Sequence, residues 1–422
     1  MNSLADPKVE PDPAASELLT RTARALFDLG SAGLAARVAR LAVASNASNG
    51  AAHSVLAGTL DATGRFEKAL RHWRKAATLT PESPRQRVNL ALALLGAGDW
   101  ESGLPLYESR LATSDWSTMA ARPGLDLMRE RLAGPDTDWT GRRVLVVTEQ
   151  GLGDAIWAAR FVEVLAARCG ALTIATNAAL RPLLARMAGA PRIVAPPAGQ
   201  VHARINLHAP EAAADHIVPI LSLPWLLGVR PADAPMGRMP YLTAEPAAVA
   251  TWRQRYLEAL PGTRRIIGLI WRANPDGPAG APRSIPVDAL APLGDLADAG
   301  FVVLQGGEPA VRMGLARVLP RVTDGLGGSA GPPPLDAFAA AMAATDIVVS
   351  VDTMGAHLAG AMAHPAIVLL PTAPSFCGMF WGHAGDRCPW YPSLRLIRQT
   401  RCLDWTGPVA AVRAALDADR LA

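Results

Sequence analysis

The first 118 residues carry a helical pattern of small and apolar positions that recurs with a fixed period. Gly30, Gly64 and Gly98 are spaced 34 residues apart. Other positions recur at the same offset, with small residues at Ala23, Ala57 and Ala91 and leucines at Leu26, Leu60 and Leu94. The clearest copy, residues 51–81, has two helical stretches around a DATGRF turn. This period predicts pairs of helices that stack on their neighbours.

The repeated segment resembles the tetratricopeptide repeat, in which small and large residues alternate so that helix pairs can pack closely. The first copy is degenerate, because Ala39 stands where the later copies have Trp73 and Tyr107. An ordinary helical bundle with chance spacing is the alternative. Repeat arrays usually present a surface to a peptide or protein and perform no chemistry themselves.

Beyond residue 140 the pattern changes to short apolar runs separated by helical stretches, which predicts parallel α/β sheets. The first series of expected strands is RRVLVVTE, ALTIATN, RIVAPP and ARINLH, and the second is RRIIGLIW, FVVLQGG, DIVVSVDT, AIVLLP and LRLIRQ. A helix is expected between the two series and another at the end of the chain. The predicted organisation is a disordered N-terminus 1–14, a repeat domain 15–118, a connector 119–140, a Rossmann-like domain 141–245, a linker helix 246–262 and a second Rossmann-like domain 263–422.

Composition limits the classes of function. No apolar run approaches the roughly 18 residues of a membrane span, and the acidic, proline-containing N-terminus does not read as a secretory signal. The four cysteines form no CxxC pair, which is typical of a cytoplasmic protein. The net charge is +4, but only Lys8, Lys68 and Lys75 are lysine and the arginines are dispersed. We therefore expect no nucleic-acid partner.

The stretch TEQGLGDAIW, residues 148–157, directly follows the first expected strand. It is not a dinucleotide fingerprint, because Ile156 occupies the place of the third glycine, and the chain has no P-loop GK[ST]. Gly151 and Gly153 would allow close backbone approach, and Asp154 could act as a base. The alternative is a plain tight turn in which Asp154 is favourable at a helix start.

A second motif, SVDTMGAHLAGAM, spans residues 350–362 and also follows an expected strand. The backbone N–H groups from Thr353 through Met354 and Gly355 to Ala356 would form an anion site, with His357 on the first helical turn. Alternatively, Asp352 or Thr353 is only a helix cap and His357 a satisfied core histidine.

Together with IGLIWRANP, RSIP and PWYPSLRLIRQ, these motifs resemble bacterial glycosyltransferases of the ADP-heptose:lipopolysaccharide heptosyltransferase type, in the branch that carries N-terminal tetratricopeptide repeats. The resemblance covers about residues 140–410. It implies a GT-B fold, with the acceptor on the first Rossmann-like domain and the nucleotide-sugar donor on the second. It also implies that Asp154 is the catalytic residue, that Asp352, Thr353 and His357 belong to the donor-phosphate helix, and that the displacement inverts. The WRANP segment departs from the family, which more often has a small residue and then glycine after the tryptophan, where this chain has Arg272 and Ala273.

The expected mechanism uses Asp154 as the base, with Glu149 as the reserve candidate beside Gly151 and Gly153 on the acceptor side. Arg272 and Arg283 would join His357 in holding the leaving nucleotide, unless they are solvated surface charges. Gln305 could meet the base or ribose of the donor. The sequence has no D-x-D motif and no cluster of ligands at metal-binding spacing. We therefore expect neither a metal nor a cofactor beyond the nucleotide sugar.

The repeats indicate the class of acceptor, because a free sugar needs no peptide-binding solenoid and a protein could use one. The arrangement is similar to tetratricopeptide-linked protein O-glycosyltransferases, including bacterial enzymes that modify flagellin. The leading expectation is therefore a transferase that acts on a protein. The alternatives are a transferase with a lipopolysaccharide or carbohydrate acceptor, and a non-catalytic repeat scaffold with a degenerate transferase domain.

Overall fold

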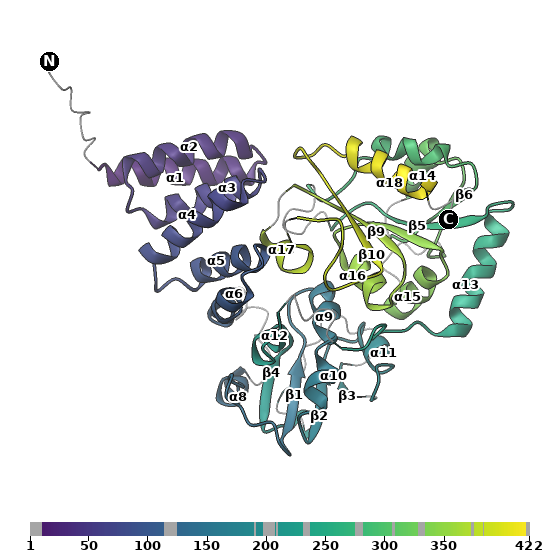
Figure 1. Ribbon diagram of the computed structural model, residues 1–422, viewed down its shortest axis with the longest axis horizontal. Coiled ribbons are helices and arrows are strands. Elements are labelled where there is room, and N and C mark those ends of the chain that lie inside the picture. The colour runs from purple at the N-terminus through teal and green to yellow at the C-terminus, as the bar shows by residue number, and fades with distance from the viewer. Residues whose placement is uncertain are drawn as a thin grey trace. The chain divides into compact units, whose positions relative to one another are not determined.

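The computed structural model describes residues 11–113, 125–189, 191–196, 207, 210–230, 237–274, 282–305, 309–327, 334–372, 375–382 and 384–418. Its contacts divide the chain into two compact units. One contains the N-terminal helices together with residues 372–383, and the other contains both sheets (Figure 1). The predicted domain boundaries are finer than this division and remain predictions.

The helical unit consists of antiparallel pairs, as the repeat predicts. Its helices are α1 (Pro13–Asp28), α2 (Ala32–Ser45), α3 (Gly50–Asp61), α4 (Phe66–Leu79), α5 (Pro84–Gly96), α6 (Trp100–Tyr107) and the 3-10 helix η1 (Glu108–Ala112). The repeated glycines lie in the turn within each pair, and Gly30, Gly64 and Gly98 have φ of 80°, 72° and 87°. This left-handed conformation favours glycine, which explains why the same residue returns at every period.

Small residues allow these helices to approach closely. Ala23, Ala57 and Ala69 are almost fully buried in one core with Leu56, Leu60 and Trp73. Trp73 packs beside Gly58 of α3, where an added Cβ would be 3.9 Å from its ring. In the degenerate first copy Ala39 is also fully buried. The small and large positions of the repeat are therefore packing positions.

One helix of this unit comes from the distant C-terminal part of the sequence. Helix α17 (Ser375–Trp381) follows β9 and precedes β10 along the chain, and it packs against α5. Met379, Phe380 and Trp381 are buried. A segment between two strands of the second sheet thus contributes to the core of the helical unit.

The first sheet is parallel, with strand order β3-β2-β1-β4. Its strands are β1 (Arg143–Val147), β2 (Ala171–Ala175), β3 (Arg192–Val194) and β4 (His216–Pro219). The first three match the predicted runs, but sequence reasoning missed β4, a strand of four residues at the edge of the sheet that ends in a proline. The expected strand ARINLH lies outside the described residues except for Leu207, which is in a turn.

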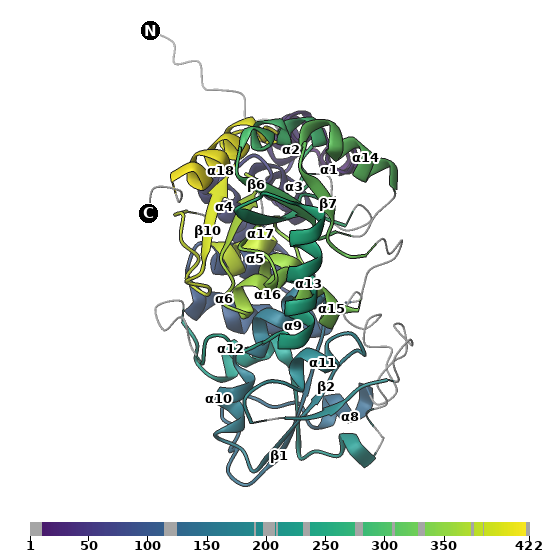
Figure 2. The same ribbon diagram turned by 90° about the vertical axis from the view of Figure 1, so that its right-hand side faces the viewer.

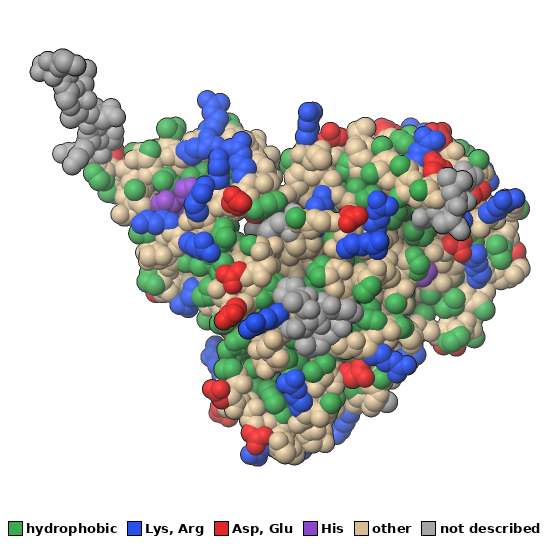
Figure 3. Space-filling view, in the orientation of Figure 1, with side chains coloured by type: hydrophobic (Ala, Val, Ile, Leu, Met, Phe, Trp, Pro, Cys, Tyr) green, Lys and Arg blue, Asp and Glu red, His purple; other side chains and the backbone are tan. Residues whose placement is uncertain are grey.

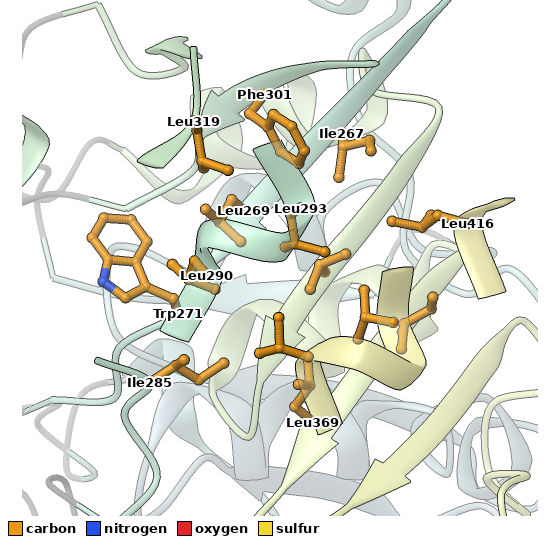
Figure 4. Packing of buried hydrophobic residues seen from close by; sticks show 14 of the residues in the cluster. Ile267, Leu269, Trp271, Ile285, Leu290, Leu293, Phe301, Leu319, Leu369 and Leu416 are labelled. Carbon is orange, nitrogen blue, oxygen red and sulfur yellow. The ribbon is translucent and has the colours of Figure 1, made fainter. Parts of the chain in front are cut away.

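The second sheet is also parallel, with order β10-β9-β8-β5-β6-β7. Its strands are β5 (Arg265–Ile270), β6 (Ala299–Val303), β7 (Val322–Asp324), β8 (Ile347–Val351), β9 (Ala366–Leu370) and β10 (Leu394–Arg398). All five predicted strands are confirmed, and β7 is an additional short edge strand. Side chains of β5, β6 and β9 pack with Trp271, Leu290 and Leu416 on one face (Figure 4).

Helices flank and connect the two sheets. The predicted connecting helix is α13 (Pro246–Ala259), and the predicted last helix is α18 (Thr406–Ala418) (Figure 2). The others are α8 (Leu125–Glu130), α9 (Leu152–Ala159), α10 (Val162–Ala166), α11 (Arg181–Leu184), α12 (Leu223–Leu226), α14 (Pro309–Val318), α15 (Leu335–Ala343) and α16 (Met354–Ala361), with 3-10 helices η2 (Pro210–Ala212), η3 (Ile220–Ser222) and η5 (Val287–Asp295). Helical repeats followed by two parallel sheets confirm the predicted fold class.

No helix in the described part of the chain is both long enough and apolar enough to span a bilayer.

Candidate active site

The two sequence motifs follow strands at which the strand order of each sheet reverses. In the first sheet β1 lies between β2 and β4, and the GLGD turn follows β1. In the second sheet β5 and β8 are neighbours at the reversal, the WRANP segment follows β5, and the SVDT turn follows β8. Crevices at such switch points are where open parallel sheets usually bind ligands.

The GLGD turn holds the carboxylate of Asp154 against its own backbone. Gly151 caps α9, and its backbone N–H donates to Oδ2 of Asp154 at 3.1 Å. A Cβ placed on Gly151 would lie 2.8 Å from the same oxygen. The preceding residue, Gln150, has a φ of 56°, which is uncommon for a residue with a side chain. A side chain at position 151 would therefore displace the carboxylate of Asp154 from its hydrogen bond with the turn.

Burial changes the acid strength of Asp154. Its side chain is only partly exposed, and desolvation, helped by the charges of Glu149 and Asp352, raises the pKa of Asp154 to about 7. The hydrogen bond from Gly151 acts in the opposite direction. A carboxyl group with this pKa is suited to general base catalysis near neutral pH.

Glu149, the reserve candidate for the base, accepts its hydrogen bond from a different segment than Asp154 does. Its side chain is buried, and Oε1 accepts a hydrogen bond from the backbone N–H of Leu221 at 3.2 Å. Leu221 belongs to η3, which follows β4. Glu149 therefore connects the two strand ends at the reversal of the first sheet.

The SVDT turn pairs Asp352 with Arg283. The guanidinium Nη1 donates to the backbone carbonyl of Asp352 at 3.1 Å and lies 3.4 Å from its carboxylate Oδ2. Thr353 caps α16 without a side-chain cap bond, and its hydroxyl donates to the carbonyl of Val351 at 3.3 Å. The structure thus brings Arg283 to the predicted anion site at the start of α16.

The two turns meet each other. A Cβ placed on Gly153 would lie 2.9 Å from Cδ2 of His357 and 3.4 Å from Cα of Met354, and helix α9 packs against α16. On the other side, Gly355 has no room for a Cβ because Ile270 of β5 fills the space. Gly153 therefore lets the start of α9 contact the start of α16, and Gly355 lets the start of α16 lie against β5. As a result, predicted residues from the two sheets share one site.

His357 is buried and uncharged at neutral pH. Desolvation lowers the pKa of its imidazole to about 4, although nearby Asp352 acts to raise it. Nδ1 lies 3.2 Å from the hydroxyl of Tyr391. That hydroxyl keeps its proton, because burial raises the pKa of Tyr391 well above its ordinary value. A neutral imidazole is a hydrogen-bonding group for a ligand and adds no positive charge.

Tyr391 belongs to a buried network that sequence reasoning missed. The hydroxyl of Tyr391 lies 3.4 Å from that of Tyr241, which donates to the backbone carbonyl of Ile156 in α9 at 2.9 Å. Because Tyr241 has used its only proton, Tyr391 must be the donor in any bond between the two hydroxyls. The network links α9 and α16 behind His357.

Arg160 stands at the centre of this network. The guanidinium donates to the carbonyl of Trp390 at 2.6 Å and lies over the rings of Tyr391 and Tyr241, with centroids at 4.4 and 5.2 Å. The side chain is almost fully buried, and in the described part of the chain no carboxylate pairs with it. Aromatic faces stabilise the cation instead. The sequence does show an arginine directly after the GLGD helix and aromatic residues in the PWYP run. The two are far apart in sequence, and no spacing between them indicates a contact.

Arg272 and Gln305 are held together by their polar groups. The side-chain oxygen of Gln305 accepts from the backbone N–H of Arg272 at 3.1 Å, and its amide nitrogen donates to the carbonyl of Arg272 at 2.8 Å. These two hydrogen bonds connect the segment after β5 to the segment after β6. The next residue, Ala273, is buried and donates to the hydroxyl of Ser284 at 3.1 Å. The roles predicted for Arg272 and Gln305 in donor binding stay predictions.

Within the described residues, no group of three or more His, Cys, Asp or Glu side chains is arranged to hold a metal ion.

Comparisons with known proteins find a relative in sequence and several in structure. No protein-family profile matches the sequence. Protein FlbA of Caulobacter vibrioides is 28% identical over an alignment of 381 residues that covers 84% of this chain and 59% of the relative. The chain thus spans about three fifths of the length of this curated relative.

Two solved structures are similar to the part of the chain with the sheets. The ADP-heptose LPS heptosyltransferase II of E. coli has a TM-score of 0.44 and 16% identity, over 65% of this chain and 98% of its own. The glycosyl transferase family 9 structure from Veillonella parvula has a TM-score of 0.43 and 14% identity, over 63% of this chain and 88% of its own. The chain itself combines paired helical repeats with two parallel sheets, the architecture that the predicted fold class requires.

Proposed function

We propose that the protein is a glycosyltransferase that moves a sugar from a nucleotide-sugar donor to a hydroxyl group of a protein recruited by the repeats. The observation that carries this proposal is the meeting of Asp154, a carboxyl group with a pKa near 7, with the start of α16 and His357. A base and an anion site side by side are the two devices that glycosyl transfer to a hydroxyl requires.

The proposed reaction is a single displacement. The Asp154 carboxylate takes the proton of the acceptor hydroxyl, and the hydroxyl oxygen forms a bond to the anomeric carbon of the sugar. The bond between that carbon and the phosphate oxygen breaks, and the electron pair leaves with the nucleotide. Attack from the face opposite the phosphate inverts the configuration.

The leaving phosphate needs stabilisation, for which this chain offers backbone N–H groups at the start of α16 and the guanidinium of Arg283. Arg283 already lies within 3.1 Å of the carbonyl of Asp352. We propose that these groups take the place of a metal ion. Arg272, on the neighbouring strand end, is proposed to reach the same phosphate. On the sequence grounds given above, we place the reaction in the cytoplasm.

The test is donor binding followed by transfer. Nucleotides and nucleotide sugars that bind the native state should raise the melting temperature of the full chain, and the rise should grow with the logarithm of ligand concentration above the dissociation constant. A stabilising nucleotide sugar should then lose its sugar to acceptor protein from the source cell in the presence of a chelator, as seen by mass spectrometry of peptides. No stabilisation by any member of a broad panel would favour a repeat scaffold that has lost its chemistry.

A further inference from the structure

A cavity of about 410 Å³ lies in the helical unit, which contains neither Asp154 nor His357. Its apolar part is formed by Leu56 and Leu60 of α3, which are both nearly buried. Four cationic side chains surround these leucines, namely Arg40 of α2 and Arg65, Lys68 and Arg71 at the start of α4 or within it. Figure 3 shows Lys and Arg side chains gathered on the visible face of this unit, near a histidine.

The remaining lining residue, His72, is fixed by a second histidine. Nδ1 of His72 lies 2.8 Å from Nδ1 of His53, whose Nε2 lies 3.1 Å from the carbonyl oxygen of Ala47. A carbonyl only accepts, so Nε2 of His53 carries the proton and its Nδ1 accepts from His72. Burial lowers the pKa of both rings, which disfavours a positive charge on the pair. The cavity thus has a fixed wall and takes its charge from the four cations.

We propose that this cavity docks an acidic peptide segment of the acceptor protein, with an apolar side chain on the two leucines and carboxylates against the surrounding cations. This inference rests on the proposed function in one respect, since it assigns the segment to the acceptor. No acidic residue lines the cavity, so its charge is uniformly complementary to an anionic partner. The apolar floor selects a peptide over a bare phosphate.

The lining also distinguishes a peptide from a nucleic acid. Proteins that hold single strands combine cations with aromatic rings on which the bases stack. The lining has no Phe, Tyr or Trp, and its only ring is the histidine that is already paired with His53. Aliphatic side chains at the base of a cationic cavity instead suit a leucine-like side chain between acidic residues.

The test measures binding of a short fluorescent peptide, with a central leucine flanked by glutamates, to the full chain by anisotropy. The double variant Arg40→Glu, Arg71→Glu should weaken binding by on the order of tenfold or more, and added salt should weaken binding to the wild type. Its matched control is Arg37→Glu, Arg74→Glu, which changes exposed arginines on the same two helices outside the cavity. The control should bind nearly as well as the wild type.

Three results would overturn the proposal. An equal loss of peptide affinity in both double variants would show a diffuse charge effect. Unchanged affinity after replacing the central leucine of the peptide by serine would show that Leu56 and Leu60 do not bind an apolar side chain. Tighter binding of a single-stranded oligonucleotide would identify a nucleic-acid site. If the glutamate variant does not fold, Arg40→Gln, Arg71→Gln replaces it in the comparison. Donor-induced stabilisation is measured on the same samples, so failure of the docking site and failure of the transferase proposal are read separately.

Discussion

The carboxyl group of Asp154 combines a turn conformation with an unusual pKa, and the two together set the expected pH dependence of activity. Because the base must be unprotonated and its pKa is about 7, kcat/KM should fall tenfold for each pH unit below about 7. Asp154→Asn should abolish transfer while leaving donor binding nearly intact. A pH–rate profile of the wild type, with donor affinity measured on the variant, checks both results.

Glu149 provides a control on this interpretation. Its negative charge helps to raise the pKa of Asp154, so Glu149→Gln should move the acidic limb to lower pH without removing activity. Glutamine can still accept the N–H of Leu221, which keeps the contact with η3. If Asp154→Asn stays active and Glu149→Gln does not, the base has been assigned to the wrong carboxylate.

Stability should also depend on pH, because the pKa values of Asp154 and His357 are shifted in opposite directions. The folded-state pKa of Asp154 is raised to about 7, so its contribution is present at low pH and is lost as pH rises towards 7. The pKa of His357 is lowered to about 4, so its contribution is present above its unfolded pKa and is lost as pH falls towards 4. Within this window the two contributions oppose each other.

In the variant Asp154→Asn, the pH dependence of the unfolding free energy should show the contribution of His357 without the opposing contribution of Asp154. The unfolding free energy of Asp154→Asn should fall more steeply than that of the wild type as pH is lowered from about 7 to 4, by at most a few kcal/mol. Denaturant unfolding at a series of pH values measures the difference. Parallel curves for the two proteins would mean that the carboxyl group titrates with its ordinary pKa.

The hydroxyl of Tyr391 should act through His357. Tyr391→Phe keeps the ring beside Arg160 and removes the hydroxyl that lies 3.2 Å from Nδ1 of His357. We expect weaker donor binding by a few-fold, together with a changed imidazole nitrogen spectrum, because the tautomer loses its partner. Tyr256→Phe is the matched control, since that buried hydroxyl donates to the carbonyl of Gly325 at 2.7 Å, away from the site. If Tyr391→Phe leaves the imidazole spectrum unchanged, the hydroxyl of Tyr391 does not set the tautomer of His357, and the network has no role in donor binding.

At the scale of elements, the start of α9 and the start of α16 can meet only because Gly153 lacks a side chain. Gly153→Ala would place a Cβ 2.9 Å from Cδ2 of His357, so α9 and α16 would have to separate. We expect a loss of about 1–3 kcal/mol of stability and a larger loss of donor binding. Gly134→Ala, where an added Cβ meets nothing within 4 Å, is the control for chemical denaturation and ligand titration.

The elements also show what sequence could and could not predict. The 34-residue period and the apolar runs predicted the helix pairs and eight of the ten strands, because periodicity reports which faces are buried. It missed β4, whose last residue is a proline, and β7, which has three half-buried residues at a sheet edge. The site motifs could be found because glycine and aspartate follow strands. The network around Arg160 could not be found, because its members are far apart in sequence and ordinary in type.

For the whole molecule, helix α17 changes how the repeats can be removed. Deleting residues 1–118 would take away α5, against which α17 packs, and would expose Met379, Phe380 and Trp381. We expect this truncation to aggregate, for a reason unrelated to acceptor choice. A second deletion that also replaces residues 372–383 with a short polar linker should be monodisperse and should keep donor binding. Light scattering and thermal shift on the two truncations check this prediction.

The same helix limits how this protein could have acquired or exchanged its repeats. An array added simply in front of a transferase could be traded between relatives at a single junction. Here the array and residues 372–383 form one packed body, although they are encoded far apart. A chimera made at one junction would pair a foreign α5 with the resident α17. Recombination that changes the recognised partner must therefore alter two distant parts of the gene together.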